Sequence, residues 1–333
     1  MNSLHQTSWG TLEMKHISKT LFMLVLLAGC AWAVGNERAT VLRPANVYLS
    51  PDTASAKLAE AERGRELIVL ESTRNWLHVE AMLGAARVQN GEDEEDVGQK
   101  TVTGWVQDRA LVRTSTPNGD RILFGEAVDS EDQASRRGGR KGAAQDAARL
   151  YYRVYDYYPT SPIAGEALYR AADIRWQIEK ADVATRPSSK QKEAFLREGM
   201  DEQLMKLVMK KFPGTKWSDL AAFHLIDNKL CGEWQGASKC PDKEADMYEK
   251  YANEHPQSPA AAEALYDAAY RRAALIQIYK TEDQAKKSDE SKGRAIALAQ
   301  KLVSQYPQGD WSARAQALLF MVQADVPTYG NSE

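Results

Sequence analysis

Apolar and polar positions alternate in short runs over the first part of the chain. These runs fall between residues 38 and 114 and are separated by turn signals such as Ser50-Pro51-Asp52 and Arg63-Gly64. A period of two places one side of each run inward, which is typical of half-buried strands. The spacing predicts several short strands that form one small all-β barrel over residues 38–114.

A helical period governs residues 144–325. Ala299, Leu302, Val303 and Tyr306 follow the i, i+3, i+4, i+7 spacing of an amphipathic helix. An aromatic residue or His before Pro, then a polar turn and an Ala-rich segment, recurs four times, at Pro159, Pro213, Pro256 and Pro307. Proline breaks a helix because it lacks an N–H and disfavours a helical residue before it. Because single helical pairs cannot bury their faces alone, the repetition predicts an all-α solenoid.

Polar residues around these prolines predict where helices start and where insertions lie. The expected N-cap residues are Ser161, Thr215, Ser258 and Asp310. The prolines are 54, 43 and 51 residues apart. We attribute this uneven spacing to polar insertions at 184–193, 231–243 and 281–292, and to longer helices.

Residues 115–143 join the two patterned regions. Asp129 to Gly142 is rich in charged residues, Gly and Ser, with no apolar residue larger than Ala134. Such a stretch buries too little surface to order itself, so we expect a flexible linker. Arg121 to Phe124 forms an apolar island in it that is suited to dock as a last strand or a short helix.

A short apolar run near the start indicates export. Leu21 to Gly29 follows Lys15 and Lys19, and it is too short to span a bilayer but suits the core of a signal peptide. We therefore expect residues 1–33 to be a signal peptide. The segment before the run has a normal length if translation starts at Met14 rather than at Met1.

The end of this run, Leu27-Ala28-Gly29-Cys30, resembles the lipobox of bacterial lipoproteins. The resemblance implies that Cys30 becomes a lipid-bearing mature N-terminus. Each buried methylene of such a lipid contributes about 0.8 kcal/mol to membrane binding. Ala31 after the cysteine implies sorting to an outer membrane. The alternative is an ordinary secretory site at Ala31-Trp32-Ala33, which would discard Cys30 and release a soluble periplasmic protein.

Export also changes what the other cysteines predict. Without Cys30 an even pair remains, Cys231 and Cys240. In an oxidising compartment this pair predicts a local disulfide, which stabilises the fold by about 2–3 kcal/mol because its loop is short. The alternative is two free thiols. A metal site is disfavoured, because no C-x-x-C pattern or neighbouring His accompanies them.

The residues of the first region resemble a bacterial SH3 domain. They include Asn46, Val47 and Pro51, then Gly64 to Leu67, Trp76 to Val79, and Gly104-Trp105-Val106. The resemblance implies a module that binds cell-wall peptides or serves as an adaptor. Tyr48, Trp76 and Trp105 would line an aromatic groove. The interpretation we favour from the sequence places Trp76 and Trp105 in the barrel core.

The second region resembles tetratricopeptide-like repeats of outer-membrane assembly lipoproteins and of the periplasmic Tol–Pal coordinator. Residues Ser161 to Tyr169 and Ser258 to Tyr266 carry this resemblance through a Ser-Pro and an Ala-Leu-Tyr sequence. A solenoid has a concave face for a peptide or partner, which the pairs Tyr151/Tyr152 and Tyr157/Tyr158 would line. The interpretation that we favour is that most of these rings pack between helices.

Composition, charge and the absence of known motifs in the sequence argue against several classes of function. The chain has 333 residues, a net charge of −3 and a pI of about 6.1, without the basic domain that nucleic-acid binding needs. His78, His224 and His255 belong to no metal or nucleophile motif, and there is no phosphate-binding loop. We therefore expect no enzyme activity, no cofactor and no metal.

These observations predict an envelope adaptor that binds an envelope protein or peptidoglycan and is held to the membrane by its N-terminal lipid. Two alternatives remain open. One is a subunit of an outer-membrane protein assembly machine. The other is an accessory or targeting subunit of a cell-wall hydrolase.

Overall fold

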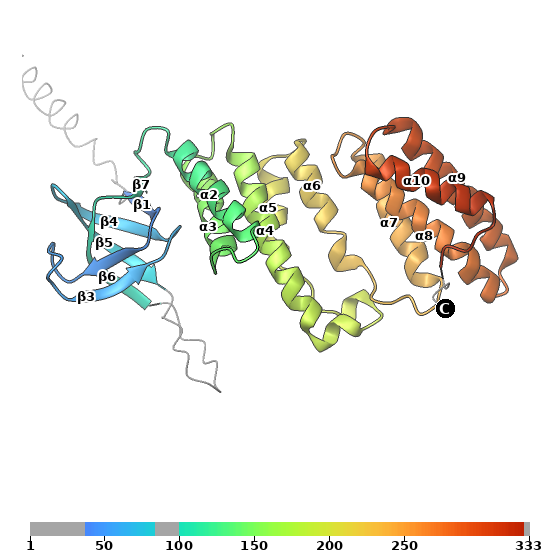
Figure 1. The fold of residues 1–333 in the computed structure, drawn as a ribbon, viewed down its shortest axis with the longest axis horizontal. Coiled ribbons are helices and arrows are strands. Elements are labelled where there is room, and N and C mark those ends of the chain that lie inside the picture. The colour runs from blue at the N-terminus through green and yellow to red at the C-terminus, as the bar shows by residue number, and fades with distance from the viewer. Residues whose placement is uncertain (1–36, 84–99, 330–333) are drawn as a thin grey trace, which may run out of the picture.

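The computed structural model describes residues 37–83 and 100–329, and it shows a sheet followed by helices. In Figure 1 the sheet lies at one end and the helices extend from it in a row. The expected β-then-α layout is confirmed. The predicted signal peptide, Cys30 and the alternative cleavage site lie outside the described residues. Within the described residues, no helix is both long and apolar enough to cross a bilayer.

Within residues 37–83 and 100–329 the sheet has seven antiparallel strands in the order β3-β2-β6-β5-β4-β1-β7. The strands are β1 (Arg38–Val41), β2 (Ala45–Tyr48), β3 (Lys57–Ala61), β4 (Glu66–Ser72), β5 (Trp76–Leu83), β6 (Lys100–Gln107) and β7 (Leu111–Arg113). Along β5, Leu77, Val79 and Ala81 are buried, whereas the alternate side chains are more exposed. The buried cluster between the strands consists only of Ala, Val and Leu.

The helices are α2 (Gly119–Ser135), α3 (Ala143–Tyr157), α4 (Ala164–Thr185), α5 (Gln203–Lys211), α6 (Lys216–His224), α7 (Lys239–Glu254), α8 (Ala261–Thr281), α9 (Ala285–Gln305) and α10 (Asp310–Gln323). Three short 3-10 helices lie among them: η1 (Pro187–Lys190), η2 (Ala194–Leu196) and η3 (Asp227–Lys229). The helices form two sets, α2 to α6 and α7 to α10, and within each set every helix packs on the one that follows it. Phe223 on α6 joins the two sets through ring contacts with Tyr248 and Tyr251 on α7.

The four repeat prolines lie in turns between helices, as expected: Pro159 after α3, Pro213 after α5, Pro256 after α7 and Pro307 after α9. The predicted caps are correct only for Thr215, whose side chain accepts a hydrogen bond from the Ser218 amide at 3.3 Å. Ser161 and Ser258 instead accept from amides of the turn two residues later. The chain makes one more turn there before α4 and α8 begin.

One predicted insertion is wrong. Residues 281–292 are mostly inside α9, which begins at Ala285. Their polar side chains cover the exposed face of the helix, while Ser288 and Ser291 face inward. The Ser288 hydroxyl donates to the Ile276 carbonyl on α8 at 2.9 Å. Because serine is small, the two helices approach closely at these positions. Since the inward residues are polar, a count of apolar residues does not show the helical period.

The expected flexible linker also differs from the structure, because most of it forms α2. Leu123, Ala127 and Ser130 are fully buried against α3, at helical spacing. The side chains of this buried face are mostly small and not strongly apolar. The composition of the segment therefore resembles that of a linker. The apolar island at Arg121 to Phe124 supplies its largest side chains, and it docks as part of a helix.

The helices are packed directly against the sheet. Val112 of β7 belongs to the same buried cluster as Leu123 of α2 and Leu150 of α3. The Thr40 hydroxyl of β1 donates to the hydroxyl of Tyr157 on α3 at 2.9 Å, in buried surroundings. The Tyr158 hydroxyl donates to the Arg113 carbonyl, also at 2.9 Å. The two regions are therefore held in a fixed arrangement by apolar and polar contacts.

Candidate functional site

An aromatic patch lies on the outer side of the sheet. We define the sheet aromatic patch as Tyr48 on β2, Trp76 and His78 on β5, and Trp105 on β6. The Tyr48 and Trp76 rings meet edge to face with centroids 5.7 Å apart, and His78 stacks on Trp105 at 4.8 Å. Trp105 is the register partner of both Tyr48 and His78. Three residues named from the sequence as a possible groove are thus brought together.

The position of these rings corrects the interpretation that placed Trp76 and Trp105 in the core. Both are half-buried, and neither belongs to the cluster between the strands. Their sequence neighbours Leu77 and Val106 are fully buried, and strand alternation sends adjacent side chains to opposite faces. Flat, half-exposed rings fixed by one another are suited to stack on an apolar or planar ligand group.

A second aromatic feature recurs along the helices. Tyr169 on α4 stacks on Trp217 at the start of α6, with centroids 5.4 Å apart. Tyr266 on α8 packs on Trp311 at the start of α10 at 5.3 Å. Each Tyr lies ten positions after one repeat proline, and each Trp lies four positions after the next. These pairs were not among the predicted site residues, although their register to the prolines is readable from the sequence.

The second pair opens into a pocket of about 340 Å³, which we call the C-terminal aromatic pocket. Its lining includes Trp234, Tyr266, Tyr270 and Trp311 with three charged side chains, Asp267, Arg271 and Arg314. Arg314 lies over the Trp311 ring at 4.8 Å. Burial raises the pKa of Asp267, against the opposing effect of Arg271, which bonds to it at 3.2 Å. The pocket thus offers several ring faces together with charges of both signs.

Tyr151 and Tyr152 do not form one surface. Tyr151 is fully buried, and its hydroxyl donates to Glu131 at 2.6 Å while Arg170 lies over its ring. It therefore belongs to the packing between α2, α3 and α4 and not to a ligand groove. Tyr152 is half-buried and meets Tyr155 edge to face at 6.1 Å. These contacts agree with the packing interpretation.

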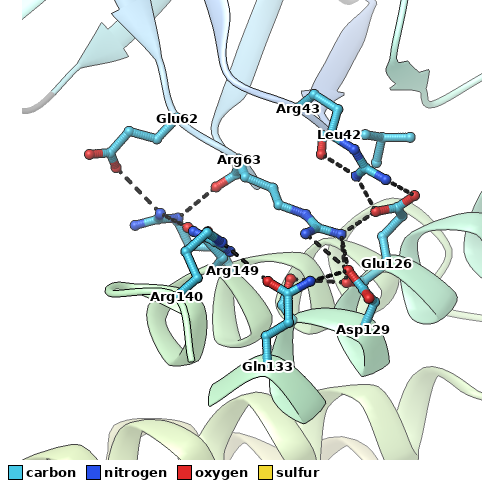
Figure 2. Close-up of polar contacts among 11 residues, drawn as sticks. Leu42, Arg43, Glu62, Arg63, Glu126, Asp129, Gln133, Arg140 and Arg149 are labelled. Carbon is cyan, nitrogen blue, oxygen red and sulfur yellow. Dashed lines mark hydrogen bonds and ion pairs between the residues drawn. The ribbon is translucent and has the colours of Figure 1, made fainter. Parts of the chain in front are cut away.

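An arginine cluster joins the sheet to α2 and α3, as Figure 2 shows. The buried Arg63, in the turn before β4, binds the Glu126 and Asp129 carboxylates and the Glu126 carbonyl of α2. Arg149 of α3 donates from Nε to the Arg63 carbonyl at 3.1 Å. A side chain at Gly64 would place Cβ 2.8 Å from Cβ of Arg149, and its φ of +76° is one that glycine adopts readily. The turn and α3 can approach this closely only with glycine at that position.

Cys231 and Cys240 lie at disulfide distance, with their Cα atoms 6.0 Å apart. This geometry is compatible with the predicted disulfide. The pair connects the loop after η3 to the first turn of α7. The Cys231 amide also donates to the buried Glu244 carboxylate at 2.9 Å.

The described histidines have local structural partners. His224 lies 3.3 Å from Asp173 and 3.2 Å from the Tyr169 hydroxyl, and burial lowers its pKa although Asp173 acts in the other direction. His255 Nδ1 lies 2.8 Å from Asp219. In the described part of the chain, no three or more His, Cys, Asp or Glu side chains are grouped so as to hold a metal.

No protein-family model matches the chain, and no curated protein matches it. The resemblances to bacterial SH3 domains and to tetratricopeptide-like repeats therefore depend on the residues quoted above.

Proposed function

We propose that the chain is a non-catalytic adaptor of the bacterial cell envelope, with an SH3-like barrel followed by a tetratricopeptide-like solenoid. Contacts of edge strand β3 with β5 and β6 support a sheet that curls on itself. The helices pack in chain order, and a proline turn follows every second helix from α3 to α9, which supports the solenoid. The resemblances implied both folds.

The observation that supports the binding role is the placement of half-buried rings at the surface and at the margins of the buried clusters. The sheet aromatic patch offers Trp76 and Trp105, and the C-terminal aromatic pocket offers Trp234, Tyr266 and Trp311. Tyr and Trp dominate binding energy where they anchor interfaces. We assign the sheet aromatic patch to peptidoglycan and the C-terminal aromatic pocket to a protein partner.

The expected location is the periplasmic side of the envelope, with the lipid at Cys30 as the anchor and a soluble form as the alternative. The cysteine pair at disulfide distance supports an oxidising compartment. The mass of the intact protein, purified from native membranes in detergent, tests this. Acyl mass on a chain starting at Cys30 supports the anchor, whereas an unmodified chain starting at Val34 contradicts it.

The binding assignments are tested with two variants and one matched control. Trp105→Ala removes a ring of the sheet patch, Trp311→Ala one of the pocket, and Phe320→Ala a ring that is 69% exposed on α10. We expect Trp105→Ala to reduce co-sedimentation with purified peptidoglycan sacculi about tenfold, while Phe320→Ala leaves it unchanged. Equal sedimentation of all three would contradict the assignment of the sheet patch.

The protein partner is tested by photocrosslinking from a benzoylphenylalanine placed at Tyr270. We expect one crosslinked envelope protein, lost in the Trp311→Ala chain and kept in the Phe320→Ala chain. A barrel-assembly protein as the product would favour the assembly-machine alternative, and a wall hydrolase would favour the targeting alternative. If the crosslinking yield is the same in the Trp311→Ala chain as in the unchanged chain, a partner at this pocket is contradicted.

A further inference from the structure

A groove of about 1170 Å³ lies between the sheet and the helices α2 and α3. We call it the junction groove. One wall comes from β3, from the turn before β4 and from the facing ends of β5 and β6. The other comes from α2, the α2–α3 turn and α3. The groove exists only because the two regions are fixed against each other, so neither region has it alone.

The lining is cationic in a chain that is acidic as a whole. Seven Arg or Lys and four Asp or Glu side chains line the groove, whereas the whole chain carries a net charge of −3. This local excess of positive charge favours an anionic ligand, because complementary potentials steer binding and select partners.

The cations divide into two groups. Arg63 and Arg149 are engaged by carboxylates and carbonyls of the junction, so they hold the two walls together. Lys100 at the start of β6 and Lys141 in the α2–α3 turn are exposed, and neither forms an ion pair within the described residues. Because these lysines lie on opposite walls, a ligand with several anionic groups is able to contact both.

The sheet wall also has a free strand edge and an apolar strip, which we define as Leu58 and Ala59 on β3 and Val102 on β6. Leu58, Ala59 and Glu60 are consecutive on β3 and all line the groove. Because adjacent strand residues point to opposite faces, three in a row line one groove only where it follows the edge of the strand. Among the described strands β3 pairs only with β2. Its other edge has backbone groups that an extended chain is able to pair with.

We propose that the junction groove binds an extended acidic peptide segment of a partner protein. Its backbone adds to the edge of β3, its apolar side chains cover Leu58 and Val102, and its carboxylates reach Lys100 and Lys141. The guanidinium groups of the groove already bind carboxylates of this chain, which shows the chemistry they accept. The apolar strip favours a peptide over a phosphate headgroup.

The test uses a fluorescein-labelled peptide of alternating Glu and Leu, titrated with the whole protein and followed by anisotropy. The double variant Lys100→Glu/Lys141→Glu is compared with Lys250→Glu/Lys286→Glu, which makes the same charge change at exposed positions on α7 and α9. We expect Kd to rise about tenfold for the first and to stay within about twofold for the second. Salt at about 1 M should weaken binding to the unchanged chain.

A second measurement follows the backbone. Hydrogen exchange at the amides of β3 should slow when the Glu-Leu peptide is added, while exchange in α10 stays unchanged. Equal Kd values for the two double variants, or equal binding of a Lys-Leu peptide, would overturn the proposal. Binding of phosphatidylglycerol vesicles that depends on Lys100 and Lys141, without peptide binding, would replace the peptide by a lipid headgroup.

Discussion

The two regions differ in where they keep their aromatic rings. The buried cluster of the sheet contains only Ala, Val and Leu, and its Tyr, Trp and His lie on the outer face. The helical clusters enclose rings such as Trp176, Tyr151 and Tyr248. The same residue types therefore serve packing among the helices and remain available for contact on the sheet. Burial, and not residue type, separates the two roles.

The largest expected effect comes from high pH. Burial raises the pKa of Tyr251 to about 12 and also raises the pKa values of Tyr151, Tyr157, Tyr169 and Tyr248. In the unfolded chain tyrosine ionises near pH 10. The stability that these groups contribute is therefore complete below about pH 10, and for Tyr251 it is lost as pH rises from about 10 to 12.

We expect the urea midpoint, followed by helical circular dichroism, to fall steeply above pH 10. Tyr251→Phe, which cannot ionise, should make that fall shallower. A midpoint that is constant from pH 8 to pH 11 would show that these rings are not buried as described.

Truncating a ring in each region tests the comparison directly. Trp176 is 2% exposed, and its Nε1 donates to Asp227 at 3.2 Å. Trp176→Ala should lower the free energy of unfolding by about 3–5 kcal/mol, because it leaves a cavity. It also removes one donor to the Asp227 carboxylate, which keeps its ion pair with Lys180 at 2.8 Å. Trp105→Ala on the sheet should cost about 1 kcal/mol or less. Urea unfolding of both variants measures the two losses of free energy of unfolding. Equal losses would show that the rings of the two regions do not differ in their contribution to stability.

The cysteine pair sharpens the comparison within the helical region. Replacing Cys231 and Cys240 by Ser should lower the free energy of unfolding by about 2–3 kcal/mol, according to the entropy of a short closed loop. Reductant should lower the stability of the unchanged chain by the same amount and leave the Ser variant unaffected. An unchanged melting temperature under reducing conditions would contradict a disulfide.

A smaller effect than that of Trp176→Ala or of the cysteine pair concerns the contact between the sheet and the helices. Tyr157→Phe leaves the Thr40 hydroxyl without its 2.9 Å partner in buried surroundings, which should cost about 1–2 kcal/mol. Tyr306→Phe is a matched control, because its hydroxyl donates to the Pro256 carbonyl at an exposed site. Urea unfolding is followed with one probe of the sheet and one probe of the helices. If the two regions unfold in one transition, both probes should report the loss of stability in Tyr157→Phe. A loss seen by the helices alone would show that the two regions unfold separately.

Much of the fold was predictable, because its signals are local. Pro159, Pro213, Pro256 and Pro307 interrupt helices for a chemical reason that needs no tertiary context. Strand alternation similarly separates Trp76 and His78 from Leu77 and Val79. It does not say which side is the core, because neighbouring strands decide that. The expectation that large rings fill a small barrel was therefore wrong for Trp76 and Trp105.

The remaining features depend on contacts between distant residues. Helix α2 buries small side chains, Ala127 and Ser130, so its packing does not appear in hydropathy. Tyr266 and Trp311 meet only after the intervening α9 has folded back on α8. The junction groove needs residues from both regions, and no segment of the sequence carries its pattern. Local patterns thus predict elements well and composite surfaces poorly.

The contact of Val112 and Thr40 with the helices has a mechanical consequence. A flexible tether absorbs relative motion of two modules as chain entropy. Here β7 is continuous with the helical core, and a hydroxyl pair and guanidinium pairs flank it. A force or torque applied to the sheet is therefore transmitted to α2 and α3. The sheet is held at one set spacing and angle to α2 and α3.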